Sequence, residues 1–72
     1  GYDTIVGFQL GSDKIDLSAL GITADNLLIQ TSGTSNTIYV EHDPGVFNAN
    51  TDLALIAITT TTGGLQLSDF IL

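Results

Sequence analysis

The chain has 72 residues, enough for one small domain that buries only about 60% of the surface that its unfolded form exposes. It contains no Cys, so disulfides, thiolate metal sites and Cys nucleophiles are excluded. Eight acidic residues against a single Lys give a net charge of −7, which disfavours nucleic acid and anionic lipid as partners and favours cations.

The apolar residues occur in short runs. The longest, Leu53–Ile58, falls far short of the roughly 20 residues that a membrane-spanning helix needs, so we expect no membrane insertion. The sequence opens on Gly1-Tyr2-Asp3 without Met, a basic segment or an apolar leader, and we expect it to be excised from a longer protein. Residues 1–72 are predicted to form a single domain.

Residues 3–8 contain consecutive β-branched side chains and predict the first strand. Simple alternation places Ile5 on one face of this strand and both Val6 and Phe8 on the other. The strand therefore is expected to have one face on the core.

The next segment, residues 11–21, combines turn and strand signals. Gly11-Ser12-Asp13 is turn chemistry, and the alternation of Ile15 and Leu17 with polar residues predicts a short, half-buried strand. Residues 16–21 are expected to close one helical turn that Gly21 ends in the left-handed conformation.

A β-hairpin is predicted over residues 27–42. Thr23 is placed to cap one helical turn before it, and residues 27–30 form a short apolar run. A cluster of turn-forming residues at 31–36 separates that run from the alternating segment 37–42.

In the second strand of this hairpin, alternation places Ile38 and Val40 toward the core and Tyr39 and Glu41 toward solvent. Asp43-Pro44-Gly45 then breaks the strand. A loop is expected to follow it.

The last third of the chain predicts two more strands. Residues 53–58 are apolar on both faces, which indicates a central strand. The Gly63-Gly64 pair predicts a tight turn into an antiparallel final strand over residues 65–72. No window shows helical periodicity, so we predict an all-β fold: a small antiparallel β-sandwich or β-roll cap with one or two short helical turns.

Both ends of the chain resemble one protein family. Gly1-Tyr2-Asp3-Thr4-Ile5 has the form of the second half of the calcium-binding β-roll nonapeptide. Residues 3–8 followed by Gly11-Ser12-Asp13-Lys14-Ile15-Asp16-Leu17-Ser18 closely resemble the segment after the repeats in serralysin-type metalloproteases and other hemolysin-type (RTX) exported proteins. Asp69-Phe70-Ile71-Leu72 is similar to the terminal motif of type I secretion substrates, an acidic residue followed by hydrophobic ones.

This resemblance implies a non-catalytic carboxyl-terminal domain of a secreted, extracellular calcium-binding repeat protein, with residues 1–8 resembling the end of the last repeat and residues 65–72 carrying the export signal. It implies a type I ABC exporter and upstream β-roll repeats of the parent chain as partners. Calcium is implied as the cofactor, mainly through those repeats. Any enzymatic activity is expected to belong to other domains.

Asp3 and Asp13 are the calcium ligands that the resemblance suggests, with Asp3 supplying at best half of a site. The family often carries Asp at the position of Gly7, so one carboxylate is absent here. Asp13 and Asp16 flank Lys14, which favours solvated turn carboxylates over ligands.

Two further groups of residues have metal-ligand chemistry. Asn48-Ala49-Asn50-Thr51-Asp52 has the alternate oxygen spacing of a calcium loop, but Leu53 stands where such a loop carries Gly. His42 lies between Glu41 and Asp43, yet one His without Cys does not complete a zinc site.

Catalysis is not expected. Ser18, His42 and Asp43 supply the side-chain types of a triad, but no Ser lies in a nucleophile-elbow motif. The alternative function is an adhesin-like or carbohydrate-binding β-sandwich module, in which Tyr2, Phe8, Tyr39 or Phe47 would stack on a sugar. A metalloenzyme fragment would need ligands that the chain lacks.

Overall fold

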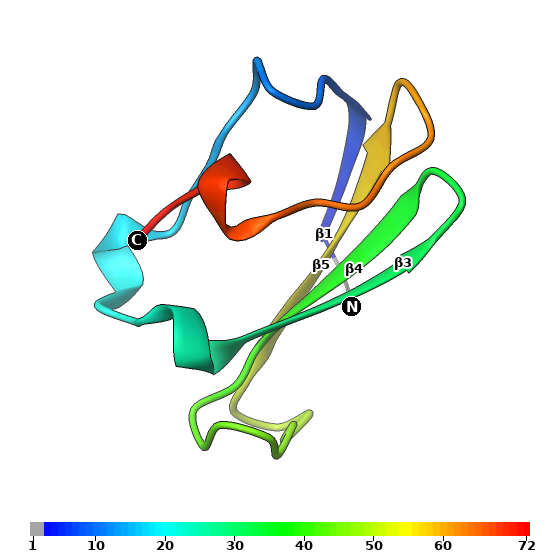
Figure 1. Cartoon of the computed structure of the whole chain (residues 1–72). Helices are drawn as coiled ribbons and strands as arrows, with labels where there is room; N and C mark the ends of the chain where they lie inside the picture. Colours follow the sequence, from blue (N-terminus) through cyan, green and yellow to red (C-terminus); the bar gives the residue numbers. More distant parts are fainter. Residues whose placement is uncertain (1–2) are drawn as a thin grey trace.

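The computed structural model describes residues 3–72 and is composed of short strands joined by loops and single helical turns (Figure 1). In chain order the elements are β1 (Asp3–Phe8), β2 (Ile15–Asp16), η1 (Ser18–Leu20), η2 (Ala24–Asn26), β3 (Leu27–Ser32), β4 (Ser35–Val40), β5 (Leu53–Thr59), η3 (Leu67–Asp69) and β6 (Phe70–Ile71). The η elements are 3₁₀ turns of three residues each. The prediction of a small all-β fold is confirmed.

Four strands form one twisted sheet in the order β1-β5-β4-β3 (Figure 1). The β3–β4 hairpin turns at Gly33, which has a φ of 62°. β5 pairs antiparallel with β4 and parallel with β1, so the sheet is mixed rather than purely antiparallel. Because β5 has a neighbour on each side, its predicted central position is confirmed, and its apolar content on both faces is explained.

A second, less regular layer covers one face of this sheet. It contains β2 and β6, which pair in parallel, and the three 3₁₀ turns. The core lies between the layers and draws on both of them: Phe8, Ile15, Leu17, Ile38, Val40, Leu55, Ala57, Leu65 and Phe70. Burial of these side chains at about 25 cal/mol per Å² is the main source of stability.

The predicted face assignment in β1 is wrong, because the strand contains a bulge. The pairing with β5 shifts between Val6 and Phe8, and Gly7 between them has a φ of 79°. As a result Val6 is 78% exposed while Phe8 is 2% exposed, although simple alternation puts them on one face. The left-handed backbone at residue 7 favours Gly and would strain an Asp.

The predicted helical turns are both present. Gly21 ends η1 in the left-handed conformation, with a φ of 64°. Thr23 precedes η2, and its N–H donates to Oδ1 of Asn26 at 3.0 Å. These features depend on neighbours in sequence, which is why they could be predicted.

The prediction that a turn at Gly63-Gly64 leads from β5 to an antiparallel strand beside it is wrong. Both sides of β5 are already occupied, by β1 and β4, so no strand can be added there. The chain instead crosses into the second layer and passes close to the sheet, where a Cβ on Gly64 would lie 3.1 Å from the Oγ1 of Thr31. In place of the predicted final strand over residues 65–72, the structure has the 3₁₀ turn η3 followed by the two-residue strand β6.

In β4 the inward positions of Ile38 and Val40 are confirmed, since both are buried. Glu41, predicted to face solvent, is buried instead. Its Oε1 accepts the N–H of Gly45 at 3.0 Å, because the chain turns back at residues 43–46 and brings that N–H over the side chain.

Candidate functional site

The segment Asp69–Leu72 spans the end of η3 and all of β6, and its four side chains fall into two classes. Asp69 and Phe70 are buried, with Phe70 in the core, whereas Ile71 and Leu72 are 46% and 41% exposed. Oδ2 of Asp69 accepts the N–H of Gln66 at 2.9 Å, which closes the 3₁₀ turn. The acidic residue of the predicted export signal therefore has a structural contact in the folded domain.

Hydrogen bonds hold this segment and the residues just before it on the rest of the molecule. The N–H of Leu17 donates to the carbonyl of Ile71 at 2.7 Å, and Nζ of Lys14 donates to the carbonyl of Ser68. The N–H of Leu65 donates to Oδ1 of Asn36 at 3.1 Å. The segment 14–17 therefore docks the tail, and its Lys is engaged with backbone.

Asn36 is the polar centre of the core. It is fully buried, and its amide group donates to the carbonyl of Ala57 at 3.3 Å while its Oδ1 also accepts the hydroxyl of Thr31 at 2.7 Å. A buried amide with satisfied hydrogen bonds is far less costly than an unpaired one. Asn36 thus joins β3, β4, β5 and the segment leading to the tail.

The two suggested calcium ligands are not brought together. Asp3 is exposed at the start of β1, whereas Asp13 follows the turn after the end of that strand. Six residues of strand span roughly 16–20 Å, too far for one ion. Oδ2 of Asp13 accepts the N–H of Gln9 at 2.8 Å, so this carboxylate closes its own turn.

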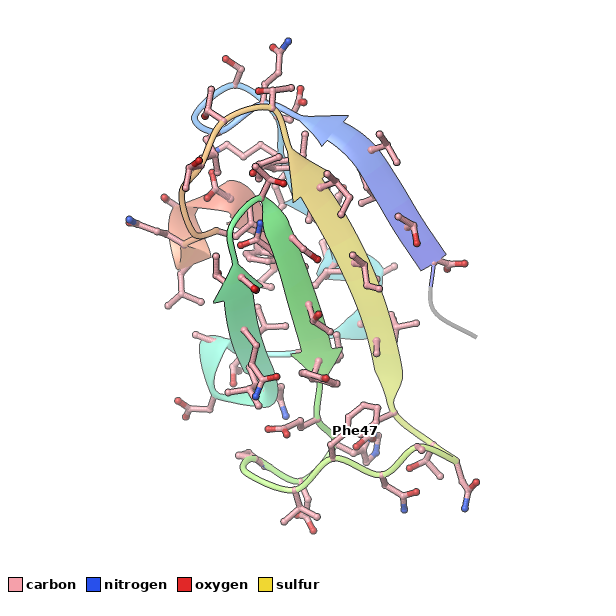
Figure 2. All side chains as sticks on the ribbon, turned by 90° about the vertical axis from the view of Figure 1, so that its right-hand side faces the viewer. Phe47 is labelled. Atoms are coloured by element: carbon pink, nitrogen blue, oxygen red, sulfur yellow. The ribbon has the colours of Figure 1, made fainter. Side chains whose placement is uncertain are left out.

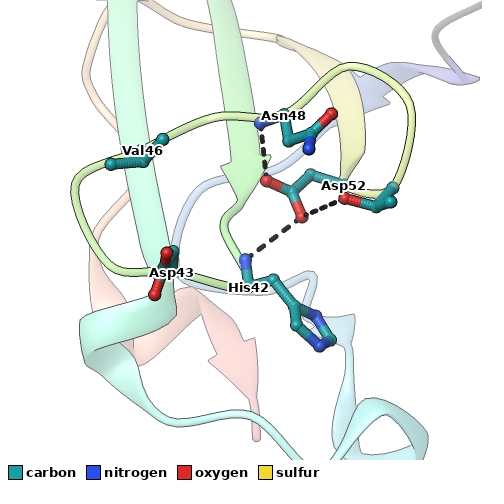
Figure 3. Close-up of a pocket in the computed structure, with 6 residues that line it drawn as sticks. His42, Asp43, Val46, Asn48 and Asp52 are labelled. Carbon is teal, nitrogen blue, oxygen red and sulfur yellow. Dashed lines mark hydrogen bonds between the residues drawn. The ribbon is translucent and has the colours of Figure 1, made fainter.

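The loop residues 48–52 form a second closed turn. Oδ2 of Asp52 accepts the N–H of Asn48 at 2.7 Å, and its Oδ1 accepts the N–H of His42 at 3.2 Å (Figure 3). These donors, led by the N–H of Asn48, lower the pKa of Asp52 from its ordinary value. Within residues 3–72, no group of three or more His, Asp or Glu side chains is placed to hold a metal ion.

A hollow of about 320 Å³ lies beside this loop and was not predicted. Its lining comes from both ends of the β4–β5 connection: His42, Asp43, Val46, Asn48, Thr51 and Asp52. The imidazole of His42 points away from the Asp52 carboxylate (Figure 3). No sequence spacing indicates this hollow, because the tertiary path of the loop creates it.

The triad side chains do not form a catalytic arrangement. Oγ of Ser18 donates to Oδ1 of Asp16 at 2.6 Å, and the Ser18 N–H donates to the same oxygen at 2.9 Å. These bonds lower the pKa of Asp16. Ser18 lies in η1, and its hydroxyl is bonded to Asp16 rather than positioned on His42.

Among the described residues, the aromatic side chains proposed for sugar stacking lie in different surroundings. Phe8 is in the core, and the rings of Tyr39 and Phe47 pack edge to face with centroids 4.8 Å apart. Phe47 lies at the end of the sheet where β4 ends and β5 begins (Figure 2). The predicted position Tyr2 lies outside the described residues.

Comparisons with models of protein families, with curated proteins and with solved structures gave no match for this chain. In the part of the chain described, none of the helices has the length and apolar content to cross a membrane.

Proposed function

We propose that this chain is the non-catalytic carboxyl-terminal cap and type I secretion-signal domain of an extracellular calcium-binding repeat protein. The observation that carries the proposal is the edge of the sheet formed by β1. Among the described residues β1 pairs only with β5, and it does so in parallel. Strands of stacked β-roll turns also run parallel, so an upstream strand can add to the free side of β1 in the same direction.

The exposed side chains of β1 suit this role. Thr4, Ile5 and Val6 are exposed and uncharged, and an open edge of this kind invites strand pairing. Repeats packed on β1 would cover it. The cap would in turn close the last repeat, which repeat proteins need for solubility.

The sequence of the last four residues supports the secretion-signal part of the proposal. The residues Asp69–Leu72 match the acidic-then-hydrophobic pattern of type I export signals. Because Asp69 and Phe70 are buried in the folded domain, the exporter would read the segment before the domain folds. Low calcium in the cytoplasm would keep the acidic repeats unfolded for passage, and calcium outside would drive their folding.

The test is an export assay in cells that carry a type I ABC exporter. A reporter fused ahead of residues 1–72 is compared with the same fusion lacking Asp69–Leu72, and the deletion is expected to abolish release into the medium. Deletion also removes Phe70 from the core, so the control is Asn36→Ala, which disrupts the buried network but leaves the tail intact. The control is expected to be exported, whereas undiminished export of the deletion variant would contradict the signal assignment.

A further inference from the structure

Two surface hollows meet at the base of the sheet. The one of about 320 Å³ beside the loop adjoins another of about 240 Å³, and the two share His42, Thr51 and Asp52 as lining residues. Together they form a groove, which we call the 42–53 groove, between the β4–β5 loop and the η1 region. Sites of this volume accept small ligands or a few side chains of a peptide.

The two halves of the groove differ in chemistry. The smaller hollow is lined by the aliphatic residues Leu20, Ile22, Val40 and Leu53, of which Leu20 and Leu53 are exposed. The larger hollow carries the carboxylates of Asp43 and Asp52. An apolar wall therefore continues directly into an acidic one.

No Lys or Arg neutralises the charge of the acidic half, although His42 is among its lining residues. Lys14 is the only Lys or Arg in the sequence, and its Nζ donates to the carbonyl of Ser68 in the tail. The Asp52 carboxylate is held in one orientation by the N–H groups of Asn48 and His42 (Figure 3). A carboxylate fixed in this way loses little side-chain freedom when a cation binds.

We propose that the 42–53 groove binds an extended peptide segment in which a Lys or Arg stands next to an aliphatic residue. The basic side chain would lie against Asp43 and Asp52, and the aliphatic one would cover Leu20 and Leu53. Charge complementarity selects this occupant, because the chain carries a net charge of −7 and an acidic segment would be repelled. This role is independent of the proposed export function.

The direct test is a titration of the ¹⁵N-labelled domain, followed by NMR, with the peptide acetyl-Ile-Lys-Ile-amide. Saturable shifts of the amides at His42, Val46, Thr51 and Leu53 are expected. Acetyl-Ile-Glu-Ile-amide should leave these amides unshifted because of its charge, and acetyl-Ser-Lys-Ser-amide should bind more weakly because it lacks the aliphatic contact. Equal shifts with the Lys and Glu peptides, or no saturable shift with the Lys peptide, would overturn the proposal.

Variants separate the two halves of the groove. Asp43→Asn and Asp52→Asn are each expected to weaken binding of the Lys peptide by about two- to fivefold, the size of an exposed ion pair. Leu20→Ser should weaken it while leaving its dependence on salt unchanged. The matched control is Asp13→Asn, which makes the same chemical change in a similar turn at the opposite end of the sheet (Figure 1). An effect of the control as large as that of both groove variants would show that only net charge matters and would overturn the site.

Discussion

Two loops at opposite ends of the sheet, Gln9–Asp13 and Asn48–Asp52, are built in the same way (Figure 1). In each, the N–H of the last residue donates to the carbonyl four residues earlier, at 2.9 Å in the first and 2.8 Å in the second. In each, the Asp carboxylate also accepts a hydrogen bond from the N–H of that earlier residue. The two Asp residues therefore close their turns by the same pair of contacts.

The loops differ in what else the Asp holds. Asp13 closes only its own turn, whereas Asp52 also accepts the N–H of His42, ten residues earlier. That second contact joins the two ends of the connection between β4 and β5. A similar local turn can therefore close one segment alone or fix a longer loop, depending on one additional donor.

Truncation of either carboxylate is expected to have the largest effect on the free energy of unfolding. Asp13→Ala should cost about 1 kcal/mol of unfolding free energy, as for other side chains that cap a turn. Asp52→Ala should destabilise the domain more, because it leaves N–H groups on both sides of the loop without their partner. Urea unfolding of the two variants measures the difference, and equal losses would contradict the role assigned to the His42 contact.

The pH dependence of stability tests how much the ionised Asp52 carboxylate contributes to folding. Because the pKa of Asp52 is lowered below its ordinary value of 3.8 in the folded state, its ionised form stabilises the fold above that value. This contribution is lost as the pH falls through the folded-state pKa. The wild type should therefore lose stability on acidification below about pH 4, and Asp52→Asn should lose less over that range. Identical pH profiles, measured by thermal unfolding, would show that the carboxylate is not linked to folding.

Much of the fold could be predicted because its signals are local. The apolar run at 27–30 and the alternation over 37–42 indicate the hairpin, although its turn is narrower than the predicted residues 31–36 because the strands extend to Ser32 and from Ser35. The apolar run at 53–58 indicates the central strand. Gly21 and Thr23 likewise marked helical turns through their nearest neighbours. Each of these depends on backbone preference and side-chain period alone.

The errors have a common cause in long-range pairing. The Gly63-Gly64 turn was predicted to add a strand to β5, but a sequence does not show that β1 and β4 already occupy both of its sides. The bulge at Gly7 reverses the face of the residues beyond it, which alternation does not reveal. Glu41 is buried by a turn that returns over it.

The same contrast between local signals and long-range contacts holds for the candidate sites. The acidic-then-hydrophobic pattern of Asp69–Leu72 is visible in the sequence, and its role as an export signal stays a prediction. The burial of Asp69 and Phe70 could not be predicted, because it requires the core around Phe70. The oxygen spacing at residues 48–52 is that of a calcium loop, with Leu53 where such a loop carries Gly. The structure shows Asp52 bonded to backbone N–H groups instead, and the adjoining groove combines residues 20–22 with 40–53, which no local motif unites.

Because the Asp carboxylates of the two loops accept hydrogen bonds from backbone N–H groups, we expect the domain to fold without calcium and calcium dependence to lie with the repeats proposed upstream. The most direct test is a comparison of amide NMR spectra of the isolated chain in chelator and in millimolar calcium. We expect a dispersed, folded spectrum in chelator, with the amides of residues 9–13 and 48–52 unmoved by calcium. A spectrum that becomes dispersed only when calcium is added, or saturable calcium shifts at Asp13 or Asp52, would contradict this expectation.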